Sequence, residues 1–219
     1  MISRSGIKSV HLSSFPPWRM GTKITCAVVI RILLMDRLCS LRLSNLSHLG
    51  DIDPSSIFTD QKSRVSCLQL HGNRFWSVDA HETKTILNYT PFLKEFQCSL
   101  PGEARPKADK GPVKMLRLFH GPDLLDLLAP LGDSLQLLEL NDNFQLWPGR
   151  QRLPFVLSSF NRLRRIVAPS ICFFQPGPPQ MDRYELFSQL PQSLEELSVS
   201  ISKHLLYPEP AQLLSDSLT

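Results

Sequence analysis

The stretch DSLQLLELNDN, residues 133–143, carries the pattern on which the fold prediction depends. Within it, Leu135, Leu138 and Leu140 occupy positions one, four and six of the segment LQLLEL. In an extended strand, positions four and six point to one side, while positions three, five and seven point to the other. The closing Asn-Asp-Asn favours a turn. The stretch therefore predicts a short strand with one apolar side, followed by a turn.

The same spacing of apolar residues recurs along the chain. The starts of seven matching segments are separated by 27, 28, 20, 22, 28 and 31 residues. One match means little in a leucine-rich chain, but a repeat period of about 20–30 residues is typical of stacked strand–helix units. A short strand cannot bury its apolar side alone, whereas stacked copies form a continuous core. The seven segments are residues 38–43, 65–70, 93–98, 113–118, 135–140, 163–168 and 194–199.

The segments between these strands have helical character, as the crossovers between parallel strands require. Helices are expected at residues 79–89, 123–129, 153–160 and 183–190. A buried strand or helix is expected within residues 24–35, because a membrane span needs about 20 apolar residues. The fold class predicted is α/β: an irregular solenoid of about seven strand–helix repeats, with a parallel sheet on its concave face. It occupies residues 38–219, and residues 1–37 form an N-terminal segment or cap.

The spacing resembles the leucine-rich repeat LxxLxLxxN, with the closing Asn matched at Asn73 and Asn143. The resemblance to a known family is more specific in the C-terminal half. LSSFNRLRRIVAPSICFF, followed by LFSQLPQSLEELSVSIS, resembles the repeat region of fungal F-box and leucine-rich-repeat proteins. This resemblance covers roughly residues 36–205. It implies a leucine-rich-repeat solenoid and a role in substrate recognition for a cullin-type ubiquitin ligase.

The F-box itself is not found. Residues 1–37 are too short for this helical module, and Trp18-Arg19 follows Pro16-Pro17 without helical apolar periodicity. We expect truncation, a mispredicted start or a true loss of the module. Binding to the ligase adaptor is expected only if an F-box is encoded upstream of Met1.

The amino-acid composition argues against several classes of protein and partner. An apolar content of 42% with 20% charged residues is that of a folded chain rather than a disordered one. The net charge of +4, without a stripe of Lys and Arg, does not favour nucleic acid as a partner. The five cysteines are odd in number and include no CxxC pair, so free thiols in the cytoplasm or nucleus are expected. No membrane partner is expected either.

No catalytic motif is present. His81-Glu82 begins like HExxH, but Thr85 stands where the second His would be needed. No GxSxG elbow, P-loop or GxGxxG occurs. We therefore expect a protein that is not an enzyme and has no catalytic, metal or cofactor site. The alternatives are a fragment or decayed copy without independent function and an enzyme with a site built across the repeats.

The candidate binding residues are the outward strand positions, which would line the concave face and contact an unknown protein partner. Phe119 beside Arg117 is the kind of aromatic and Arg pair found at interface hot spots. Glu95 and Glu196 also face outward in this register. For each position, an ordinary solvated strand residue is the alternative. The predicted residues are Arg42, Gln69, His71, Gln97, Arg117, Phe119, Glu139, Asn141 and Arg165.

Overall fold

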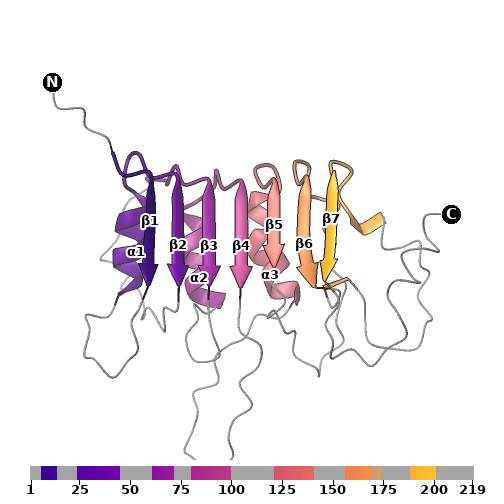
Figure 1. Cartoon of the computed structure of the whole chain (residues 1–219), viewed down its shortest axis with the longest axis horizontal. Coiled ribbons are helices and arrows are strands. Elements are labelled where there is room, and N and C mark those ends of the chain that lie inside the picture. The colour runs from indigo at the N-terminus through magenta and orange to yellow at the C-terminus, as the bar shows by residue number, and fades with distance from the viewer. Residues whose placement is uncertain are drawn as a thin grey trace, which may run out of the picture.

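The described residues form an open, seven-stranded parallel sheet in which each strand pairs with the next described strand of the sequence (Figure 1). The computed structural model describes residues 6–13, 24–44, 61–71, 80–99, 121–140, 156–169, 172–173 and 188–200. The fold class is therefore α/β with a parallel sheet, as predicted. The strands are β1 (Ser9–Ser13), β2 (Ser40–Ser44), β3 (Cys67–His71), β4 (Glu95–Ser99), β5 (Leu137–Leu140), β6 (Arg165–Pro169) and β7 (Glu196–Ser200).

The three α-helices of the described residues lie behind one face of this sheet (Figure 1). They are α1 (Cys26–Leu33), α2 (Ala80–Asn88) and α3 (Gly121–Leu128), and a 3-10 turn η2 (Ala129–Leu131) extends α3. The two helices expected near residues 79–89 and 123–129 are confirmed as α2 and α3, and residues 24–35 contain α1. Within 153–160, the described residues 156–160 form a turn instead. No helix among the described ranges is long and apolar enough to span a membrane.

The core lies between the sheet and the helices, and the apolar residues at the predicted positions form it. Positions one, four and six are at most 2% exposed in five of the segments, for example at Leu135, Leu138 and Leu140. Leu197 and Val199 on β7 are only partly buried, since no described strand follows them. Position four is aligned across the whole sheet, at Val10, Leu41, Leu68, Phe96, Leu138, Ile166 and Leu197.

A ladder of backbone hydrogen bonds fixes where each strand begins. The carbonyl of Lys8 accepts from the N–H groups of both Cys39 and Ser40, at 2.8 and 3.1 Å. Equivalent carbonyls one residue before the strands accept two N–H groups from the next repeat in the same way. Because these bonds recur at every step, all seven strands start in the same register. The accepting carbonyls belong to Lys8, Cys39, Ser66, Lys94, Gln136 and Arg164.

Six of the seven predicted segments contain strands, β2 to β7. The remaining one, residues 113–118, lies outside the described residues. In the sequence it falls between β4 and β5, which are direct hydrogen-bonded neighbours in the sheet. The first strand, β1, lies within the segment assigned to the N-terminal cap. Val10 and Leu12 of this strand, together with Ile7 just before it, have the repeat spacing, so β1 is an eighth match that the predicted set of seven does not include.

Candidate functional site: the open face of the sheet

The sheet has one face on which no described helix packs (Figure 1). We call it the open face and define it by positions three, five and seven of the repeats. On β1 to β4 these positions carry mainly polar side chains, which a core-facing surface would not tolerate. Its described residues are Ser9, His11, Ser13, Ser40, Arg42, Ser44, Cys67, Gln69, His71, Glu95, Gln97, Ser99, Leu137, Glu139, Arg165, Val167, Pro169, Glu196, Ser198 and Ser200.

Four of the predicted binding residues form one row across this face. Arg42, Gln69, Gln97 and Glu139 are register partners on the neighbouring strands β2 to β5. Parallel strands lie about 4.8 Å apart, so the row runs about 14 Å from a positive to a negative side chain.

The other predicted residues lie apart from this row. His71 is one pleat further along β3, next to Ser44 in register. Arg165 is aligned with Leu137 on one side and Glu196 on the other. Arg117, Phe119 and Asn141 lie outside the described residues, so their placement stays a prediction.

The N-terminal end of the open face holds a group that we call the basic cluster: His11, Arg42, Ser44 and His71. The Nε2 atom of His11 lies 2.9 Å from the Oγ atom of Ser44. The Nε–H group of Arg42 donates to the same Oγ atom at 3.4 Å. Ser44 is only 7% exposed and contacts both His11 and Arg42. His71 is its register partner on β3.

The cluster is electropositive. Burial lowers the pKa of His71 below its ordinary value of 6.5, and Arg42 lowers it further. Glu139 raises this pKa and His11 lowers it, both more weakly. His71 is therefore neutral at pH 7, in a site where an added positive charge is unfavourable.

Two arginines at the other end of the sheet are paired with glutamates. The Nε atom of Arg165 lies 3.2 Å from Oε1 of Glu196, and Arg164 pairs with Glu195 at 3.4 Å. No carboxylate of the described residues forms an ion pair with Arg42. Among the described residues of the open face, Arg42 on β2 thus has no carboxylate partner, whereas Arg165 on β6 has one.

Two cysteines, Cys67 and Cys98, have a raised pKa, so neither is activated as a nucleophile. Burial raises the pKa of Cys67, a hydrogen bond from Ser40 lowers it, and Glu95 raises it again, with a net rise. Burial alone raises the pKa of Cys98. None of the five cysteines, all of which lie in described positions, forms a disulfide. Within the described ranges no group of three His, Cys, Asp or Glu side chains could hold a metal ion.

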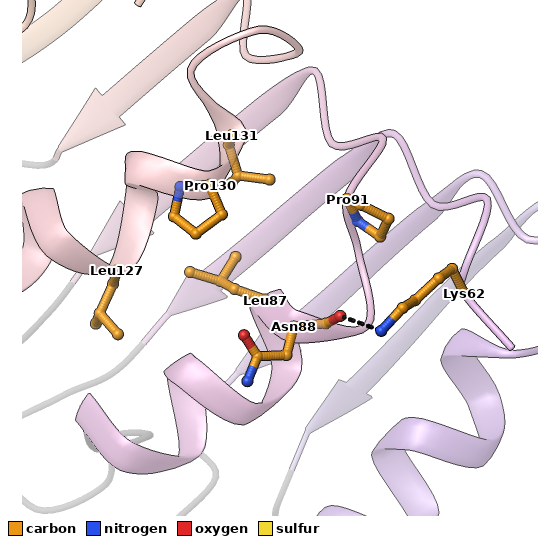
Figure 2. Close-up of a pocket in the computed structure, with 7 residues that line it drawn as sticks. All are labelled: Lys62, Leu87, Asn88, Pro91, Leu127, Pro130 and Leu131. Atoms are coloured by element: carbon orange, nitrogen blue, oxygen red, sulfur yellow. Dashed lines mark hydrogen bonds between the residues drawn. The ribbon is translucent and has the colours of Figure 1, made fainter. Parts of the chain in front are cut away.

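A pocket of about 190 Å³ lies on the helical side, between the end of α2 and the η2 turn (Figure 2). Leu87, Leu127 and Leu131 supply apolar walls. At its rim the Lys62 ammonium donates to the carbonyl of Asn88 at 3.2 Å and lies 5.6 Å from the centre of the Tyr89 ring. A cation bound to the last carbonyl of a helix is stabilised by the helix dipole. This contact gives Lys62 a structural role.

Sequence reasoning missed two members of the basic cluster, His11 and Ser44. Ser44 occupies position seven of the first predicted segment, so it could have been included with His71, which has the same position in the second. His11 is position five of the overlooked N-terminal repeat.

Comparison of the chain with family models, with curated proteins and with solved structures gives no match.

Proposed function

We propose that this protein is a non-catalytic interaction module whose open face binds another protein. The observation that carries the proposal is the in-register row of Arg42, Gln69, Gln97 and Glu139 on a face without described helices. Strand pairing fixes the backbone positions of these four residues before binding, so a partner can be recognised by their fixed spacing. The finer architecture that we propose is an irregular leucine-rich-repeat solenoid, with the open face as its concave side.

The row also supplies specificity. Its charge changes from positive on β2 to negative on β5, with two neutral amides between. A partner with the opposite order of charges is favoured, while the reverse orientation places like charges together. Arg42 has no carboxylate partner in the described part of the chain, and Arg is enriched among interface hot spots, so we expect Arg42 to contribute most to binding in the row.

The experiment is a quantitative capture of partners by the tagged chain and by two variants with the same charge change. Arg42→Glu reverses a charge on the open face, and Lys84→Glu reverses one at an exposed position of α2. The expected result is a partner that is retained with the wild-type chain and with Lys84→Glu but lost with Arg42→Glu. Direct titration with that partner, once purified, must show the same order of affinities. A partner lost equally with both variants would contradict binding through the open face.

The resemblance to F-box and leucine-rich-repeat proteins suggests a more specific form, in which the bound protein is a substrate of a cullin-type ubiquitin ligase. We propose this role with binding to the ligase adaptor as its criterion. Co-purification of the full-length gene product with adaptor and cullin is the expected result. If a capture retains an open-face partner but neither adaptor nor cullin, the ligase role is contradicted and the binding role remains.

A further inference from the structure

The basic cluster places donor groups from three neighbouring strands on one small area of the open face. His11 and Arg42 are register partners, as are Ser44 and His71. Neighbouring strands are about 4.8 Å apart, and alternate residues along a strand about 6.6 Å apart. The three strands span two such gaps, so the four residues lie within an area of about 10 by 7 Å. This is the scale of one tetrahedral oxyanion with its hydrogen-bond shell.

The charges in this area call for an anion. The Nε–H group of Arg42 donates to Ser44. Its two terminal nitrogens make no hydrogen bond within the described residues. These nitrogens remain for a ligand. Arg164 and Arg165, by contrast, are each paired with a glutamate. A charged guanidinium fork without a carboxylate partner is well suited to bidentate contact with a phosphate.

We propose that the basic cluster binds a phosphate monoester, with Arg42 as the main anchor and with His11 and His71 as additional donors. The proposal rests on the proposed function in one respect, since the phosphate would lie on the same face as the partner. A phosphate dianion presents three acceptor oxygens and close to two negative charges, which a carboxylate does not. Ser44 acts as a positioning residue, because it fixes Arg42 and His11 relative to each other.

Binding must depend on pH through His71. The groups that face this imidazole are Arg42 on β2, His11 on β1 and Glu139 on β5, with the uncharged Ser44 and Ser99 as its register neighbours. An anion beside His71 favours the imidazolium and raises its pKa. Affinity for blocked phosphoserine, whose second pKa of about 6 keeps it mainly dianionic in this range, is therefore expected to be higher at pH 6.5 than at pH 8.

The test is a titration of the full chain with inorganic phosphate, followed by NMR of the His11 and His71 imidazoles, with sodium chloride at equal ionic strength as the reference. Phosphate should shift both sets of signals, and Arg42→Ala should weaken the affinity by about tenfold or more, the loss expected for one charge-assisted contact. Arg164→Ala, the matched control, should bind like wild type. Equal affinity of Arg42→Ala and wild type, or shifts produced by chloride alone, would overturn the site. Thermal unfolding of Arg42→Ala confirms that the variant is folded.

The source of the phosphate is resolved by a second arm with blocked phosphoserine and blocked serine. Tighter binding of phosphoserine than of inorganic phosphate supports the site and points to a phosphorylated side chain of a protein partner. Equal affinity supports the site and points to a free phosphorylated compound. Binding of blocked serine as tight as that of phosphoserine overturns it. Failure of the phosphate site would leave the partner-capture experiment unaffected, so the two proposals can fail separately.

Discussion

The Oγ atom of Ser44 lies 2.9 Å from the Nε2 atom of His11, although 33 positions separate the two residues in the chain. Parallel pairing of β1 with β2 brings them together, since Leu12 and Ser13 are the register partners of Leu43 and Ser44. The contact is thus a consequence of register. Any residue substitution that shifts β1 by one position would turn His11 toward the core.

The strand register predicts different costs for neighbouring residues of β5. Leu138→Ala should lower the free energy of unfolding by about 2–5 kcal/mol, because a fully buried core side chain leaves a cavity. Glu139→Ala, on the open face, should change it by less than about 0.5 kcal/mol. Urea denaturation of both variants measures the difference. Similar losses at the two positions would show that the register is wrong.

Ser63 is expected to stabilise the junction between two repeats. Its buried hydroxyl donates to the carbonyl of Leu33 at 2.6 Å and accepts from the N–H group of Val65 at 3.1 Å. Ser63→Ala should cost about 1–3 kcal/mol, because it leaves a buried carbonyl and a buried N–H group without their partner. Ser66→Ala is the control, since that more exposed hydroxyl makes one long bond of 3.3 Å. A thermal shift no larger than that of the control would argue against the predicted role of Ser63.

Stability should fall as the solution is acidified, with a contribution from His71. Its pKa in the folded protein is lowered, so the unfolded chain binds this proton more readily. The favourable contribution is present above the unfolded value of about 6.5 and is lost as the pH falls through the folded pKa. Chemical denaturation at pH 7.5 and at pH 5.5 should show a smaller pH dependence for His71→Gln than for wild type. An identical dependence would mean that His71 does not contribute.

Thiol labelling should follow burial. Cys39 is exposed and should react first with iodoacetamide, whereas Cys67 is half-buried and has a raised pKa that keeps it protonated. Cys98 is fully buried, and burial raises its pKa further, so it should react only on unfolding. Mass spectrometry of labelled peptides over time gives the order. Labelling of Cys98 as fast as Cys39 in the folded chain would contradict the placement of β4.

The candidate site could be predicted in part. Arg42, Gln69, Gln97 and Glu139 were expected on one face because side chains alternate along a strand, and this rule acts within a few residues. Their alignment in one row depends on the register between strands, which the local sequence pattern does not specify. His11 is absent from the predicted residues because residues 1–37 were assigned to the N-terminal cap, although Ile7, Val10 and Leu12 match the repeat spacing in full.

By itself, the sequence determined the strand segments and the side of each strand that enters the core. The apolar residues at positions one, four and six do this locally, through the alternation of a strand and the free energy of burying leucine-sized side chains. Tertiary structure decided which segments become neighbours, including the pairing of β4 with β5 and the addition of β1. It also decided that His11, Arg42 and Ser44 meet, because such contacts depend on hydrogen bonds between strands far apart in the chain, and many alternative pairings would satisfy the same apolar spacing.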